Sequence, residues 1–131
     1  MYRIAKSFSF EASHQLTGLP DGHKCGRLHG HTYRVEVVLE NANLTDCGFV
    51  VDFADLAPFK AYLDASLDHR HLNDVFDFAP TSENLAHHLY GWCRAELPCQ
   101  VGELVAAVCL SETGSTWVEF RPEHAAGEGD H

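Results

Sequence analysis

The first part of the chain holds two stretches in which apolar and polar side chains alternate. Along residues 2–14 the apolar side chains share one parity, which only Lys6 interrupts. Along residues 29–40 a second alternation separates an apolar face, which includes Tyr33, from a charged face. Successive side chains of a strand point to opposite faces of its sheet, so both stretches predict half-buried strands. Residues 15–28, with three glycines and a proline, predict the loop between them.

Two later segments repeat their apolar residues at helical spacing. Residues 54–67 carry a stripe of Leu56, Phe59, Leu63 and Leu67. Residues 82–97 carry a stripe of Leu85, Leu89, Cys93 and Leu97. This spacing predicts two amphipathic helices, each with one apolar face packed on the rest of the molecule. Thr81 or Ser82 is suited to cap the second helix, because each offers a hydroxyl to the amides of the first turn.

The last third of the chain predicts two more strands. Residues 103–112 are apolar on both parities, which is typical of a strand covered on both faces. Residues 116–121 are expected to pair with that strand as a hairpin. The order β-β-α-α-β-β predicts an α+β domain with an antiparallel sheet. We expect one domain over residues 1–122 and a flexible acidic tail over residues 123–131.

The charge and the cysteine content narrow the functional classes. Nine basic residues stand against nineteen acidic ones, giving a net charge of −10. This balance argues against a general nucleic-acid binder or a binder of anionic membranes, so an anionic ligand requires a local basic pocket. The odd number of cysteines, five in all, favours free thiols. The N-terminal residues lack the apolar run of a signal peptide, so we expect a cytoplasmic protein.

Three histidines are predicted to meet at one end of the sheet. His29 and His31 lie two apart and therefore share a face, and His14 shares its parity with the apolar residues of the first strand. If the first two strands pair antiparallel, all three imidazoles converge. A single histidine on an apolar face is more often a hydrogen-bonded core residue, but three together favour a metal site. Three imidazoles and one open position are typical of catalytic zinc.

A cysteine precedes these histidines in the segment HKCGRLHGH. Lys24, Arg27 and a bound metal would favour the thiolate form of Cys25, which could then act as a base. Cys25 lies four residues before His29, which leaves enough chain to approach the metal without binding it. The alternatives are a fourth metal ligand and an inert packed thiol.

Two further places carry candidate chemistry. In LDHRHLN, Asp68 beside His69 is suited to orient the imidazole and to favour its protonated form, although a surface turn is the more common explanation of such a pair. Glu112 ends an otherwise apolar strand. Its two oxygens match a ligand with two parallel N–H donors, such as a guanidine or a 2-amino-4-oxopyrimidine edge. The alternative for Glu112 is a solvated strand end.

The segments FEASHQL, HKCGRLHGH, LDHRHLN, PTSENLA and SETGS together resemble one family over residues 3–121. The chain resembles the 6-carboxy-5,6,7,8-tetrahydropterin synthases (the QueD group), which are related to the 6-pyruvoyltetrahydropterin synthases. The Cys-x3-His-x-His spacing resembles the carboxy-forming branch, because the pyruvoyl-forming enzymes place more residues between the cysteine and the histidine.

The resemblance implies a tunnelling fold (T-fold), in which protomers join their sheets into a barrel as trimers and two trimers stack into a homohexamer with active sites between subunits. It implies zinc (Zn2+) bound by His14, His29 and His31, and Cys25 as the catalytic base. It further implies that Asp68 and His69 of a neighbouring subunit transfer protons. The pterin would be held by the carboxylate of Glu112 and the hydroxyls of Thr81 and Ser82.

The implied substrate is 7,8-dihydroneopterin triphosphate, and the implied products are 6-carboxy-5,6,7,8-tetrahydropterin, acetaldehyde and triphosphate. In this family the product leads to 7-deazaguanine compounds, either queuosine in tRNA or a specialised deazapurine. We expect the triphosphate to be bound by basic side chains from two segments, namely His23, Lys24, Arg27 and Arg70. The alternatives are a 6-pyruvoyltetrahydropterin synthase and a non-catalytic zinc- or pterin-binding protein.

Overall fold

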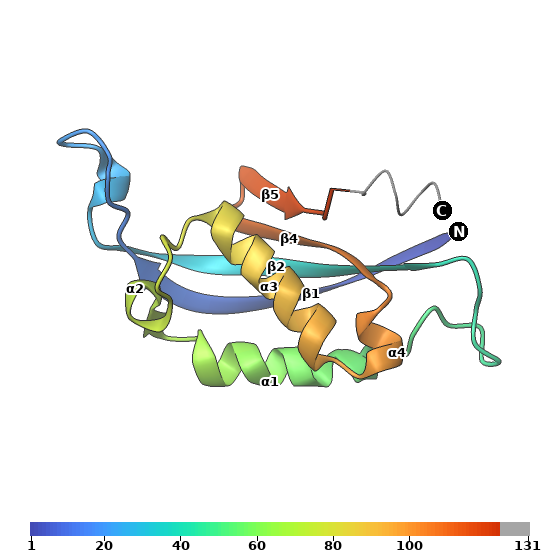
Figure 1. The fold of residues 1–131 in the computed structure, drawn as a ribbon. Helices are drawn as coiled ribbons and strands as arrows, with labels where there is room; N and C mark the ends of the chain where they lie inside the picture. Colours follow the sequence, from blue (N-terminus) through green and yellow to red (C-terminus); the bar gives the residue numbers. More distant parts are fainter. Residues whose placement is uncertain (124–131) are drawn as a thin grey trace.

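Two long strands form the centre of the fold (Figure 1). β1 (Tyr2–His14) and β2 (His29–Asn41) pair antiparallel along their whole length, from Tyr2 opposite Asn41 to His14 opposite His29. β4 (Val105–Thr113) pairs with β2, β5 (Thr116–Phe120) pairs with β4, and β3 (Arg70–His71) adds parallel to β1. The result is a five-stranded sheet in the order β3-β1-β2-β4-β5, antiparallel except at β3.

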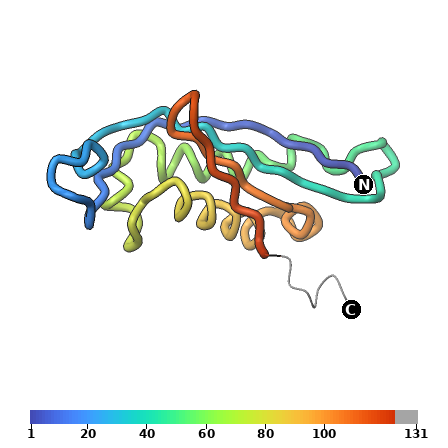
Figure 2. The backbone as a smooth tube through the Cα atoms, turned by 90° about the horizontal axis from the view of Figure 1, so that it is seen from above, coloured from blue at the N-terminus to red at the C-terminus, as the bar shows by residue number. Residues whose placement is uncertain are grey.

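This computed structural model describes residues 1–123. The predicted tail therefore lies outside the described residues from 124 onward. Seen from above, β1 and β2 run side by side, and the loops that follow each of them lie at opposite ends of the sheet (Figure 2). None of the helices within residues 1–123 has the length and apolar character needed to cross a lipid bilayer.

The helices cover one face of this sheet. They are η2 (Phe53–Leu56), α1 (Ala57–Ser66), α2 (Leu72–Val75), α3 (Ser82–Glu96) and α4 (Cys99–Gly102), and a short 3-10 turn, η1 (Lys24–Gly26), lies in the loop after β1. The predicted stripes form the core: Leu56, Phe59, Leu63, Leu67, Leu85, Leu89 and Cys93 are all fully buried. Each such aliphatic or aromatic side chain contributes roughly 1.5–3 kcal/mol when it leaves water.

Local sequence explains where the long helix begins and ends. The Thr81 hydroxyl accepts a hydrogen bond from the backbone N–H of Asn84 at 3.1 Å, so Thr81 is the cap and Ser82 is left for another contact. The helix ends at Glu96. The next residue, Leu97, precedes Pro98, and the proline ring disfavours a helical backbone at Leu97.

Three expectations about the elements need correction. The single helix expected over residues 54–67 is a 3-10 turn followed by an α-helix that begins next to Pro58. The short elements at residues 70–75 and 99–102 were not expected. The strand expected over residues 103–112 begins at Val105, and its second face is covered only in part within one chain: Ala107 is buried, whereas Cys109 is half-buried. All five cysteines are free thiols, as predicted.

Candidate active site

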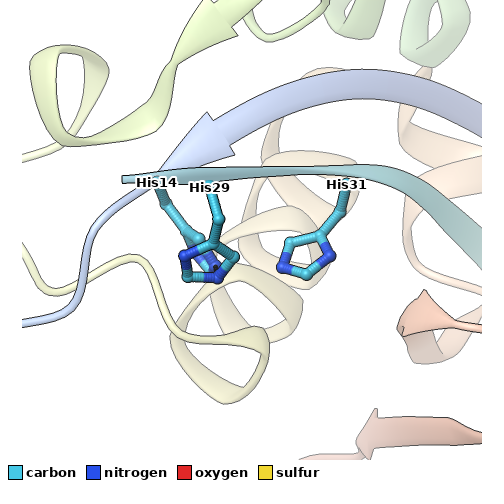
Figure 3. Close-up of side chains that lie close together, drawn as sticks. All are labelled: His14, His29 and His31. Carbon is cyan, nitrogen blue, oxygen red and sulfur yellow. Dashed lines mark hydrogen bonds between the residues drawn. The ribbon is translucent and has the colours of Figure 1, made fainter. Parts of the chain in front are cut away.

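The strand register brings three histidines together on the helix-covered face, as the pairing argument predicted. His14 lies directly opposite His29, and His31 follows two residues along β2. One ring nitrogen of each lies within 4.8 Å of the others. Figure 3 shows the three rings on the same side of the two strands. His14 is fully buried, and His29 and His31 are half-buried.

Two of these rings have their hydrogen positions fixed by backbone carbonyls. Nδ1 of His14 lies 2.8 Å from the carbonyl oxygen of Pro80, and Nδ1 of His29 lies 2.6 Å from that of Arg27. A carbonyl oxygen only accepts, so each Nδ1 carries the hydrogen and each Nε2 carries a lone pair in the neutral ring. The two Nε2 atoms lie 2.9 Å apart. Two lone pairs at that distance repel each other, and a cation bound by both relieves the repulsion.

The third ring leaves a buried nitrogen without a hydrogen bond. Nε2 of His31 has no hydrogen-bond partner among the described residues, although Oε2 of Glu112 lies 3.3 Å away. Burial lowers the pKa of His31, and the nearby carboxylate of Glu112 opposes this shift only in part. The neutral imidazole is the form that binds a metal. The donor set and this orphaned nitrogen therefore fit a zinc ion.

The histidine cluster has three members within the described part of the chain, and Cys25 is not one of them. This argues against Cys25 as a fourth ligand. Cys25 lies half-buried in η1, and its backbone N–H donates to Nδ1 of His23 at 3.0 Å. Lys24 and Arg27 are exposed and form no ion pair with any residue in the range 1–123.

Glu112 joins the end of β4 to the start of α3, next to the histidines. The Ser82 hydroxyl donates to Oε1 of Glu112 at 2.5 Å. The two residues line a cavity of about 280 Å³ together with Leu16, Thr81 and Trp117. Glu112 is therefore not a solvated strand end, because one oxygen meets a hydroxyl and the other faces His31.

Asp68 and His69 form a pair at the outer edge of β1. Oδ1 of Asp68 accepts the backbone N–H of Glu11 at 2.7 Å, and Oδ2 lies 2.9 Å from Nδ1 of His69. The backbone amide of Glu11, and after it His69, lower the pKa of Asp68. His69 has a left-handed backbone, with φ of 59°, and its own N–H donates to the Glu11 carbonyl. The pair is thus built by backbone contacts and is not a free surface turn.

This pair and the histidine cluster lie on different faces of the sheet. His69 lines a hollow with Glu11, Ser13 and Thr32, whose side chains lie on the face that the helices leave open, and this hollow extends to His31 of β2. His14 has the opposite parity on β1 and faces the helices. The structure of one chain therefore unites the three histidines with Glu112 and Ser82 but does not bring Asp68 and His69 to them.

Two residues that support the histidine cluster were not identified from the sequence. Tyr33, interpreted as an apolar core position, is fully buried, and its phenol oxygen lies 3.1 Å from Nδ1 of His14. Burial, together with the carboxylate of Glu112, raises the pKa of Tyr33 well above its usual range, so the phenol stays neutral. The only sequence signal for this role is the parity that Tyr33 shares with His29 and His31. Pro80 acts through its backbone carbonyl, for which the sequence has no signal.

Known proteins share both the sequence motifs and the fold of this chain. A Synechocystis protein named 6-carboxy-5,6,7,8-tetrahydropterin synthase is 42% identical over 106 residues, which cover 74% of this chain and 75% of that protein. A Pyrococcus furiosus dihydroneopterin monophosphate aldolase is 36% identical over 99 residues, 76% of this chain and 81% of its own. The structure of Caenorhabditis elegans 6-pyruvoyl tetrahydropterin synthase superposes with a TM-score of 0.81 at 24% identity, covering 93% of this chain and 96% of that one. This similarity confirms the predicted T-fold.

The family model described as 6-pyruvoyl tetrahydropterin synthase matches residues 3–123, which is nearly the whole described chain. The match includes every segment that carried the resemblance, from the strand that ends in His14 to the strand that ends beside Glu112. Sequence motifs, fold and family model agree, and the chain belongs to the 6-pyruvoyl tetrahydropterin synthase family.

Proposed function

We propose that this protein is a zinc-dependent lyase that converts 7,8-dihydroneopterin triphosphate and water into 6-carboxy-5,6,7,8-tetrahydropterin, acetaldehyde and triphosphate. Family membership makes the chain a pterin-processing lyase. The observation that carries the finer proposal is the cluster of three imidazoles beside Glu112. The name of the Synechocystis relative and the Cys-x3-His-x-His spacing support the carboxy product. The product would then serve the synthesis of 7-deazaguanine compounds.

His14, His29 and His31 would hold the zinc ion through their Nε2 atoms and leave one position open to substrate. Bound there, zinc would polarise the hydroxyl groups of the substrate side chain and make their protons more acidic. The carbonyls of Pro80 and Arg27 keep the rings of His14 and His29 in the tautomer that presents Nε2.

Glu112 would orient the pterin. Its carboxylate can accept two parallel N–H bonds from the 2-amino group and the adjacent ring nitrogen of the substrate. Ser82 holds Oε1 of that carboxylate, and Thr81 fixes the start of α3 from which Ser82 projects. These contacts give the carboxylate one orientation before the substrate arrives, which lowers the entropy cost of binding.

Cys25 would be the base. As a thiolate it would take the proton from the side-chain carbon next to the ring, and the pterin would accept the electron pair that this leaves. Elimination of triphosphate, addition of a water molecule to the side chain and cleavage of the carbon–carbon bond would follow.

Asp68 and His69 would return protons to the substrate. The Asp68 carboxylate accepts from Nδ1 of His69, which leaves Nε2 of that ring to deliver a proton. Because this pair lies on the open face, we propose that it serves the site of a neighbouring subunit in a homohexamer of two trimers. Two sheet edges that are free within residues 1–123 support this assembly: in that range β5 pairs only with β4, and β1 meets β3 only at Ala12 and Ser13.

The triphosphate would be bound by Lys24 and Arg27. Both are exposed cations in an otherwise acidic protein. The other two basic candidates already have partners, since His23 accepts from the Cys25 amide and Arg70 donates to the carbonyl of Ala65 at 3.0 Å. Triphosphate binding therefore falls mainly to the loop after β1.

The test is to incubate the zinc-loaded protein with 7,8-dihydroneopterin triphosphate and to identify the products by mass spectrometry. We expect carboxytetrahydropterin with acetaldehyde, no product from the Cys25→Ala variant, and retained zinc in that variant. Pyruvoyltetrahydropterin alone would assign the sister activity instead. Cleavage of the monophosphate substrate in preference to the triphosphate would assign the aldolase activity named for the Pyrococcus furiosus relative. Tight pterin binding without turnover would indicate a non-catalytic protein.

A further inference from the structure

Outside the two strands that it connects, the described loop that carries Cys25 is hydrogen-bonded to one side chain, that of Asn73. Gln15 follows the last residue of β1 and begins this loop. Its backbone N–H donates to Oδ1 of Asn73 at 2.8 Å, and its carbonyl accepts from Nδ2 of Asn73 at 2.8 Å. The side-chain amide of Asn73 thus imitates one rung of strand pairing. Among the described residues, apart from the β1–β2 ladder and the bond between Nδ1 of His29 and the carbonyl of Arg27, this pair alone joins residues 15–28 to another element by hydrogen bonds.

The contact is passed on to Cys25 by two further hydrogen bonds. Nε2 of Gln15 donates to the carbonyl of Gly26 at 3.0 Å, and the backbone N–H of Leu16 donates to the carbonyl of Cys25 at 3.1 Å. Gln15 and Leu16 therefore hold the carbonyl of Cys25 and that of the next residue, Gly26. The remaining hydrogen bonds of the loop, such as that from the Cys25 amide to His23, are local.

The position of Asn73 is itself fixed by packing and by strand pairing. It lies in α2, directly after Leu72, which is fully buried. The preceding β3 pairs with β1 beside Ala12 and Ser13, and Nδ1 of His71 lies 2.9 Å from the Ser13 hydroxyl. The segment that carries Asn73 is thus bound to β1, the strand that ends in His14.

We propose that Asn73 is a positioning residue for Cys25. Through Gln15 it holds the loop so that the thiol keeps one place relative to His14 and the zinc ligands. This inference rests on the proposed role of Cys25 as the base, and it gives a function to the asparagine of LDHRHLN and the glutamine of FEASHQL. A displacement of about 1 Å at a reacting group can cost roughly 10²-fold in rate, so such a clamp matters for turnover.

The test measures the rate at which an aromatic disulfide reagent labels Cys25. Cys47 and Cys99 are exposed and are first replaced by serine. Cys93 and Cys109 remain slow, because burial raises the pKa of Cys93 to about 12 and of Cys109 to about 11. In this background Asn73→Ala should speed labelling of Cys25 at least about fivefold, since the loop loses two neutral hydrogen bonds. Gln15→Ala, at an exposed position, should act in the same direction with a smaller change.

Asn41→Ala is the matched control, because Oδ1 of Asn41 accepts from the Asn43 amide and fixes the loop at the other end of the sheet. Its labelling rate should equal that of the background protein. In the enzyme assay Asn73→Ala should lower kcat by roughly 10²-fold, while KM changes little and zinc affinity is kept. Labelling within twofold of background for both Asn73→Ala and Gln15→Ala, or an equal acceleration in Asn41→Ala, overturns the proposal. Absence of turnover in every protein, with labelling accelerated as expected, would contradict the proposed lyase activity and leave the contact between Asn73 and the Cys25 loop standing.

Discussion

The histidine cluster and the loop that carries Cys25 sit at the same end of the sheet but are built in different ways. The histidines lie on the same face of two neighbouring strands. The antiparallel register of these strands is enough to set His14 opposite His29. Cys25 lies in a 3-10 turn whose hydrogen bonds are local, apart from the route through Gln15 to Asn73. One region is held by the sheet and the core, and the other is held by a few side-chain contacts.

This difference shows how a rigid ligand set can stand beside a group that has to meet the substrate. A one-residue slip would turn every side chain of a strand to the other face, so strand register fixes the imidazoles strongly. Loops move more readily and carry much of the chemistry in proteins. The predictions that follow test this contrast, from the largest expected effect to the smallest.

The largest effect is expected when one imidazole is removed. His29→Ala should weaken zinc binding by more than the roughly 10- to 100-fold that loss of an outer partner costs. Competition with a chromophoric chelator measures this affinity. His87→Ala is the control, because His87 is exposed on α3 and stacks on Phe120 away from the cluster. Unchanged zinc affinity in His29→Ala would contradict the assignment of the cluster as a metal site.

The second prediction tests whether the two faces of the sheet cooperate across subunits. Cys25→Ala and His69→Ala should each abolish turnover alone. If a site takes Cys25 from one chain and His69 from its neighbour, random mixing in equal amounts restores roughly a quarter of the wild-type rate. The measurement is turnover after the two variants are unfolded and refolded together. A mixture as inactive as its parts would place both groups in sites of single chains.

The third prediction concerns the cations beside Cys25. Lys24→Glu with Arg27→Glu should raise KM for the triphosphate substrate by about 10²-fold, because two charge-assisted contacts become repulsive. Lys6→Glu with Lys60→Glu makes the same change in net charge on β1 and α1 and should leave KM nearly unchanged. An equal rise of KM in both double variants would mean that overall charge, and not the loop, attracts the substrate.

The fourth prediction probes the support of His14. Tyr33→Phe keeps the ring that stacks on Phe10 at 4.9 Å and removes the oxygen 3.1 Å from Nδ1 of His14. We expect zinc affinity to fall about tenfold, in the range found for outer partners of metal ligands. Tyr62→Phe removes a comparable contact, 2.7 Å from Nε2 of His88, outside the cluster and should not alter zinc affinity. Equal affinity of wild type and Tyr33→Phe would show that Pro80 alone orients the ring.

The same contrast explains what the sequence could and could not predict. Parity and pairing were enough for β1, β2, the two long helices and the convergence of the histidines, because these follow from periodicity and burial. Residues 70–75 and 99–102 were missed, since elements of two to four residues carry no periodic signal. The contacts of Pro80 and Glu11, and those of the Gln15 backbone with Asn73, were also out of reach, because backbone groups act there and most residue types supply them. The face on which Asp68 and His69 lie depends on a left-handed backbone at His69, which is uncommon for a residue other than glycine.

The smallest effect is expected at the Asp68 pair, which backbone contacts hold at the sheet edge. The pKa of Asp68 is lowered in the folded chain by the Glu11 amide and by His69. A lowered pKa stabilises the fold at pH values above the ordinary aspartate value of 3.8, and this stabilisation is lost as the pH falls through the lower pKa of the folded state. The melting temperature of wild type should therefore exceed that of Asp68→Asn at neutral pH, and the difference should close as the pH falls below about 3.8.

Asp64→Asn is the control, because Asp64 forms an exposed i,i+4 pair with Lys60 and such pairs contribute little to stability. Melting curves of wild type and Asp68→Asn that stay parallel from neutral to acid pH would mean that the Glu11 amide does not bind the carboxylate in solution, and the edge pair would then be as loosely held as an ordinary surface turn.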